Sequence, residues 1–209
     1  EEDVGEALRW YRLAADQGYG IELETAIKKL RVAAGAGDRD AVEDLAENYL
    51  AGKGVEQDFD EASKWFLKAI GEDDDWSYCF RWMIESTNQQ DVMDWIQAGI
   101  DRGDANFMIG LAGCYETGVI DANDDEISTI TEKLYRQAAK LGDETARLIF
   151  AETILGNGKD PISEFGEKHQ EALNYRFELA EGGDTHAQFF LANMYLEGNG
   201  IEQNKAEAY

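Results

Sequence analysis

One helical signature recurs along this chain, and its repetition constrains the fold more than any single residue does. Each copy begins at a small or aliphatic residue, here called the anchor, and positions are counted from it. A residue that is usually bulky stands three positions later, and a pair of small or aliphatic residues stands at positions seven and eight. Position eleven is Gly, or in one copy Asp. Because these offsets lie on one face of an α-helix, each copy predicts one amphipathic helix that ends near a left-handed glycine. The anchors are Ala7, Ala26, Ala62, Val92, Thr131, Ala172 and Ala206, and they predict helices near residues 5–17, 24–36, 59–71, 90–102, 127–141 and 168–181.

A second pattern fills the stretch between these helices. An aliphatic residue, Ala and Tyr follow a closing glycine at fixed spacing, and another glycine comes shortly after the Tyr. The repeating unit is therefore helix A, which carries this second pattern, followed by helix B, which carries the anchor signature. Most anchors are 30 to 41 residues apart, which is the period of a helix–turn–helix solenoid. The copies of the second pattern are Leu45-Ala46-Tyr49, Leu111-Ala112-Tyr115, Leu191-Ala192-Tyr195 and the variant Phe150-Ala151-Ile154.

The repeat resembles the Sel1-like repeat family, which is related to tetratricopeptide repeats. The match is carried by LAENYLAGKGV at 45–55, LANMYLEGNGI at 191–201 and ALRWYRLAADQG at 7–18. The resemblance implies an all-α fold, a right-handed α/α superhelix with a concave face that holds other proteins. We expect one solenoid over residues 1–209, with about six repeats and incomplete at both ends. The residues with structural roles in the repeat are Gly37, Tyr49, Gly52, Gly54, Trp65, Gly103, Tyr115, Gly142, Gly183, Tyr195, Gly198 and Gly200.

Two places depart from the pattern. The step from Ala7 to Ala26 is about 17 residues short, which indicates either a degenerate repeat or a missing segment. The unit at 73–103 fits poorly, and Asn88-Gln89-Gln90 stands where its glycine loop should be. That unit is a hinge, a binding site or a drifted repeat.

The charge of the chain limits its partners. The formal net charge is −25 over 209 residues, which argues against binding nucleic acid or anionic lipid through a basic surface. The same charge favours fast association with a basic protein, although it is also compatible with a role in solubility alone. No stretch of 18 apolar residues predicts a membrane span. Cys79 and Cys114 fall in different repeats and are expected to be buried thiols rather than a disulfide.

No motif in the sequence predicts catalysis, a metal or a cofactor. His169 and His186 lack partners at metal-ligand spacing, and none of the five serines lies in a nucleophile motif. Penicillin hydrolysis, associated with some Sel1-like proteins, therefore has no matching residue here. Asp121, Asn123, Asp125 and Glu132 match part of a calcium loop, but Glu126 replaces its essential glycine. We expect these residues to cap a helix instead.

The sequence favours a non-enzymatic scaffold that binds a partner protein on the concave face, which helix A would line. Trp76, Tyr78 and Trp82 are candidate partner contacts because Trp and Tyr are enriched in interaction hot spots; the alternative is that they pack between repeats. Family resemblance favours a bacterial protein of the periplasm, cell envelope or secreted space. One alternative function is an immunity or inhibitor protein that neutralises a basic toxin or effector, and a second is a hydrolase of cell-wall peptides or β-lactams.

Overall fold

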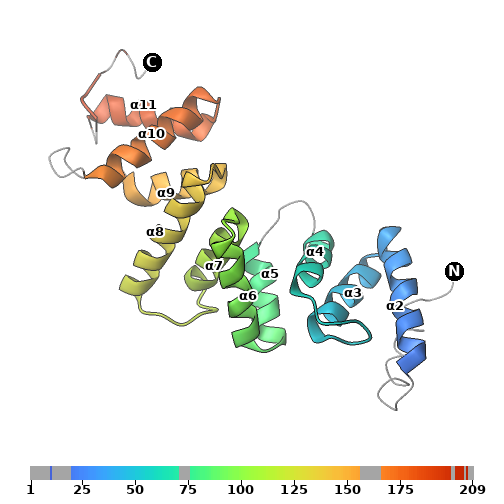
Figure 1. The fold of residues 1–209 in the computed structure, drawn as a ribbon. Coiled ribbons are helices and arrows are strands. Elements are labelled where there is room, and N and C mark those ends of the chain that lie inside the picture. The colour runs from blue at the N-terminus through green and yellow to red at the C-terminus, as the bar shows by residue number, and fades with distance from the viewer. Residues whose placement is uncertain are drawn as a thin grey trace. The chain divides into compact units, whose positions relative to one another are not determined.

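The structure of the chain is a computed structural model that describes residue 10, residues 20–70, 76–155, 166–198 and 201–204, and residue 206. This part of the chain forms ten α-helices and no β-strand (Figure 1), so the predicted all-α solenoid class is confirmed. Even-numbered helices are copies of helix B and odd-numbered helices are copies of helix A. The predicted helix near 5–17 lies outside the described residues, apart from Trp10. The helices are α2 (Gly20–Gly35), α3 (Arg39–Ala51), α4 (Phe59–Ile70), α5 (Trp76–Ser86), α6 (Gln89–Asp101), α7 (Ala105–Glu116), α8 (Asp124–Lys140), α9 (Glu144–Leu155), α10 (Glu167–Glu181) and α11 (Thr185–Glu197).

The chain divides into two compact units between Ala98 and Gly99. In the first unit α2 packs on α3, α3 on α4, and α4 on α5. In the second unit the packed pairs are α7 with α8, α8 with α9, α9 with α10, and α10 with α11. Each helix in these pairs therefore contacts its neighbour in sequence, which is the packing of a repeat protein. A single solenoid through residues 1–209 stays a prediction, as do its handedness and its concave face.

A Gly-Asp pair makes the turn from helix B to helix A. The N–H of Gly37 donates to Ala34 O at 3.2 Å, and the N–H of Asp38 donates to Ala33 O at 3.1 Å. This pattern ends α2 with Gly37 in the left-handed region, at a φ of 95°. The Asp38 side chain then accepts the Ala41 N–H at 3.1 Å and caps α3. One dipeptide thus ends one helix and begins the next, and it recurs as Gly103-Asp104, Gly142-Asp143 and Gly183-Asp184.

Glycine also ends two of the helix A copies, α3 and α11. Gly52 after α3 and Gly198 after α11 are left-handed C-caps, with φ of 65° and 74°. A glutamine then crosses back over each turn, because Gln57 donates to Leu50 O at 2.8 Å and Gln203 donates to Leu196 O at 2.7 Å. Gly54 also has a positive φ of 72°, whereas Gly200 lies outside the described residues.

Small side chains let the paired helices approach one another. The anchor and pair positions of helix B include alanines with no exposed surface, such as Ala34, Ala62 and Ala138. The larger repeat residues fill the spaces beside them. Tyr49 is 8% exposed, and Trp65, Tyr115 and Tyr195 are half-buried.

The irregular repeat at 73–103 keeps its two helices, α5 and α6, but connects them without a glycine loop. Asn88 caps the start of α6, because its Oδ1 accepts the Gln90 N–H at 3.1 Å and its Nδ2 donates to Asp91 at 3.0 Å. Later in the same repeat, Gly99 of α6 lies under the ring of Phe107 in α7. A Cβ on Gly99 would come within 2.1 Å of that ring, so close helix contact there requires glycine.

Candidate functional site

The three aromatic residues predicted to contact a partner all lie on α5 but on two different faces. Tyr78 and Trp82 both contact Phe66 of α4, with ring centroids 5.7 Å and 4.3 Å away. Trp76 instead packs edge-on against Phe80, at 5.6 Å, and Phe80 is fully buried. The structure therefore brings Tyr78 and Trp82 together and leaves Trp76 apart from them.

Exposure separates Tyr78 from Trp82. The Trp82 ring lies nearly parallel to Phe66, at an interplanar angle of 13°, and is half-buried. Tyr78 is 52% exposed, so it is the aromatic residue of α5 with most area left for a partner. Phe66, on which both rings rest, was not singled out in the sequence. Its position four residues after the anchor Ala62 could have revealed it.

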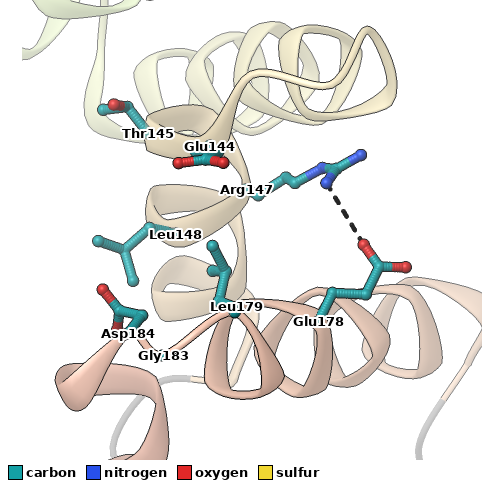
Figure 2. Close-up of a pocket in the computed structure, with 9 residues that line it drawn as sticks. Glu144, Thr145, Arg147, Leu148, Glu178, Leu179, Gly183 and Asp184 are labelled. Atoms are coloured by element: carbon teal, nitrogen blue, oxygen red, sulfur yellow. Dashed lines mark ion pairs between the residues drawn. The ribbon is translucent and has the colours of Figure 1, made fainter.

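In the second unit, a pocket of about 480 Å³ lies between α9, α10 and the start of α11 (Figure 2). Leu148 of α9 and Leu179 of α10 give it an apolar part. Three acidic residues surround them: Glu144 on α9, Glu178 on α10 and Asp184 at the start of α11. Sequence motifs do not predict this pocket, because its side chains come from three helices that meet only when the repeats pack.

The pocket carries more negative than positive charge. The one cation among its described lining residues, Arg147, has its guanidinium 3.4 Å from Glu178 and 5.3 Å from the Tyr175 ring centroid. Arg147 Nε also donates to Ala139 O at 3.2 Å. Arg147 is thus compensated by Glu178, while Glu144 and the capping residue Asp184 add further negative charge. An apolar group next to a cation would fit this surface best.

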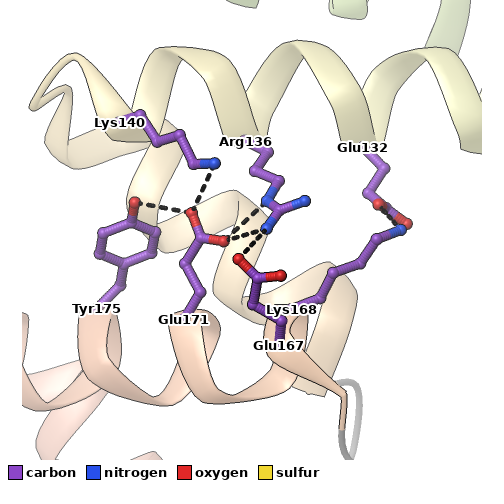
Figure 3. A network of polar contacts seen from close by, with 7 residues as sticks. All are labelled: Glu132, Arg136, Lys140, Glu167, Lys168, Glu171 and Tyr175. Carbon is purple, nitrogen blue, oxygen red and sulfur yellow. Dashed lines mark hydrogen bonds and ion pairs between the residues drawn. The ribbon is translucent and has the colours of Figure 1, made fainter.

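An ion-pair network joins α8 to α10 beside this pocket (Figure 3). Glu171 is its centre: it lies 2.6 Å from Arg136 and 3.7 Å from Lys140, and it accepts the Tyr175 O–H at 3.2 Å. Lys168 pairs with Glu132 in the same network. Because α8 and α10 are helix B copies of successive repeats, the network links one repeat to the next.

The network changes the titration of its members. Burial alone would raise the pKa of Glu171, but the hydrogen bond and charge of Arg136, with Lys140, bring that pKa below its ordinary value. The hydrogen bond from Arg136 to Glu171 raises the pKa of Arg136 in turn. Burial, followed by the charge of Glu171, raises the pKa of the Tyr175 hydroxyl. The shifts of Glu171 and Arg136 favour their ion pair near neutral pH, and the shift of Tyr175 keeps its hydroxyl protonated as a donor to Glu171.

The predicted helix cap at 121–132 is confirmed. Asn123 Oδ1 accepts the Glu126 N–H at 3.0 Å, and Glu126 accepts the Asn123 N–H at 3.2 Å, which forms a capping box at the start of α8. Among the described residues, no group of three or more His, Cys, Asp or Glu could hold a metal ion. Within the same part of the chain, no helix has the length and apolarity to cross a membrane. Cys79 and Cys114 are buried free thiols.

The comparison with protein families decides what kind of protein this is. The family model of the Sel1 repeat matches residues 1–19, 40–74, 103–143 and 185–209, which is more than half of the chain. The chain belongs to the Sel1 repeat family. Sel1 repeats generally mediate protein–protein interaction, and the family is typically a non-catalytic scaffold. No curated protein matches the chain.

Among the solved structures that resemble the chain are two repeat proteins. One is c5321, a protective antigen present in uropathogenic Escherichia coli strains that displays an SLR fold; it is 22% identical, with a TM-score of 0.46, over 96% of this chain and 46% of its own. The other is a Sel1 repeat protein from Oxalobacter formigenes, 19% identical, with a TM-score of 0.46, over 99% of this chain and 59% of its own. This Sel1 repeat chain thus spans about half the length of the structures it matches.

The residues of the α9–α11 pocket fall outside the matched segments. All nine lie between 144 and 184, in the gap between the third and fourth matches. Helix α5, with Tyr78 and Trp82, lies in another gap, at 75–102. The candidate contact residues therefore lie outside the segments that the family model matches.

Proposed function

We propose that this Sel1 repeat chain is a non-enzymatic scaffold that binds a basic partner protein, with the α9–α11 pocket as a principal contact. The observation that carries the proposal is the pocket's composition, in which Leu148 and Leu179 lie among three acidic side chains. The starts of two helix A copies, α9 and α11, contribute to this pocket, in keeping with the expectation that helix A lines the binding face. The partner segment would place an aliphatic side chain next to a lysine or arginine.

The overall charge supports the same kind of partner. At −25, the chain attracts a cationic protein over distances of about the Debye length, roughly 10 Å at 0.1 M salt. Long-range attraction raises the association rate, while the pocket contacts determine how long the complex lasts. We place this scaffold in a bacterial cell envelope or secreted setting, as the family resemblance favours.

The charge also favours a more specialised alternative, an immunity or inhibitor protein that neutralises one basic toxin or effector. The two functions differ in affinity and in the number of partners. Tight, salt-sensitive binding to a single cationic enzyme, with loss of that enzyme's activity, would favour the inhibitor. Several partners bound in the micromolar range would favour the scaffold.

The test is partner capture with two variants that change the net charge equally. In Glu144→Lys/Glu178→Gln both changes lie in the pocket; in Glu56→Lys/Glu202→Gln both lie at exposed positions away from it. If each pocket change removes about 0.5–1 kcal/mol, the pocket variant binds roughly tenfold more weakly. In the control variant, only the rate of association with the partner should fall. Equal loss in both variants would show that charge alone acts and that the pocket is not the contact.

A further inference from the structure

A second, smaller cavity lies in the first unit, between α3 and α5. Its volume is about 200 Å³, and its lining includes Glu47, Asn48, Leu50, Lys53 and Trp82. Pockets for drug-sized ligands measure roughly 300–1,000 Å³. This cavity therefore has the size for one side chain rather than for a whole small molecule.

Asn48 is the unusual residue of this cavity. It lies directly before the tyrosine of helix A, and in α7 and α11 that position holds the buried residues Cys114 and Met194. Asn48 is as buried as they are, with 1% of its surface exposed. A polar amide here needs partners for its donor and its acceptor, which a thiol or thioether does not.

Only half of that need is met. Asn48 Nδ2 donates to Asp44 O at 2.8 Å, and this bond fixes which end of the amide is the oxygen. Asn48 Oδ1 has no hydrogen-bond partner among the described residues. An unpaired buried acceptor destabilises the fold, so Asn48 stabilises this position less than methionine or cysteine would. A ligand that donates a hydrogen bond would complete it.

Trp82 provides the second half of a recognition site. Its ring lines the cavity and is held in place by the parallel stack on Phe66. A guanidinium group is flat, stacks on aromatic rings and donates hydrogen bonds in its own plane. A cavity lined by a fixed indole ring and by a residue with an unpaired amide oxygen therefore suits a guanidinium better than it suits a compact ammonium.

We propose that this cavity receives the guanidinium of an arginine from the partner; the identity of that partner as a basic protein rests on the proposed function. One guanidinium N–H donates to Asn48 Oδ1, and its plane lies against Trp82. Glu47 adds an attractive charge, and the exposed side chain of Lys53 can turn towards solvent. Because Asn48 is covered in the free protein, binding includes the rotation of a neighbouring side chain.

The experiment is an NMR titration of the whole chain with N-acetyl-arginine amide, observed at the side-chain N–H signals of Asn48 and Trp82. We expect saturable shifts at both, with a Kd of about 10 mM or lower. N-acetyl-citrulline amide, which has the same shape without the charge, should bind at least about tenfold more weakly, and so should N-acetyl-lysine amide. No saturable shift, or an equal response to all three probes, would overturn the proposal.

Two variants separate binding from folding. Asn48→Met copies the residue of α11 and should keep the melting temperature of the wild type or exceed it, while arginine affinity falls at least about tenfold. Trp82→Leu should lose a similar affinity through loss of the flat ring. Asn106→Met, at an exposed position of α7, is the control and should bind as the wild type does. A less stable Asn48→Met variant with unchanged arginine binding would make Asn48 a structural residue and end the proposal.

The outcome is independent of partner capture, because the titration contains no partner protein. If the titration shows no arginine binding but partner capture still depends on the α9–α11 pocket, only the arginine site is overturned. If the titration shows arginine binding but both charge variants weaken partner capture equally, the α9–α11 contact is overturned and the arginine site remains supported.

Discussion

Arg176 occupies a position of the repeat that is apolar or aromatic in the other described copies. Four residues after the anchor, helix B has Leu30, Phe66, Ile96 and Tyr135, all buried, and Arg176 is buried completely. Its guanidinium lies 3.2 Å from Glu152 and 4.4 Å from the Phe190 ring centroid. Apart from that ion pair, its nitrogens have no hydrogen-bond partner among the described residues. The desolvation of this cation is thus only partly offset.

Replacement of Arg176 by leucine should therefore leave the fold equally stable or stabilise it. Buried ion pairs replaced by apolar residues often gain about 1–4 kcal/mol, and Leu30 shows that leucine suits this position. Glu152→Ala in the wild type should be destabilising, because it leaves the cation without its partner. In the Arg176→Leu background the same change should have almost no effect. Urea denaturation of the four proteins measures this coupling, and additive changes would show that the pair contributes nothing.

At the scale of the helix, Gly99 tests how close α6 and α7 lie. Alanine normally stabilises a helix interior over glycine by about 1 kcal/mol, but here its methyl group would overlap the Phe107 ring. We expect Gly99→Ala to lower stability by roughly 1–3 kcal/mol through overpacking. Gly35→Ala, with nothing within 4 Å of the new methyl group, is the matched control and should be neutral or stabilising. Thermal melts followed by circular dichroism give both values, and equal effects would contradict the close contact.

The α8–α10 network predicts a pH dependence. The pKa of Glu171 is lower in the folded chain than its ordinary value of 4.5, so its stabilising effect is complete above about pH 5 and is lost as the pH falls through the folded pKa. The stability difference between the wild type and Glu171→Gln should therefore shrink on acidification from pH 7 to about pH 3. Glu85→Gln, in an exposed pair with Arg81, should change stability by less than about 0.5 kcal/mol. A Glu171 difference that stays constant with pH would show that the network does not hold the carboxylate ionised.

What the sequence predicted at this scale was local. The left-handed glycine at the end of a helix B copy and the Asn123–Glu126 cap each depend on residues a few positions apart, so their spacing alone reveals them. The candidate site is different, because Leu148 and Leu179 meet only after α9 packs on α10. Helical spacing already places Tyr78 and Trp82 on one face, but their shared contact with Phe66 depends on how α4 packs against α5. Packing between helices, rather than helix formation, is therefore what the sequence left open.

For the whole molecule, net charge should make salt act in opposite directions on folding and on binding. A charge of −25 repels itself in the folded chain, and salt screens that repulsion. Ion pairs such as Lys28–Glu24, which are mostly exposed, lose little when screened. An increase from about 0.05 M to about 0.5 M NaCl should therefore raise the melting temperature, by about 2–4 °C for each kcal/mol gained.

The same increase in salt should weaken the complex with a basic partner, mainly through a slower association rate. Melting curves and surface-based binding kinetics at matched salt concentrations give the two trends on one protein. If salt strengthened both folding and binding, apolar contact would dominate the interface. The proposal of a basic partner would then be wrong, and an apolar partner would take its place. If salt weakened both, the exposed ion pairs would outweigh the net charge. Opposite trends would indicate that the negative charge of the chain serves to attract a partner. They would not be expected of a chain whose ion pairs mainly hold its repeats together.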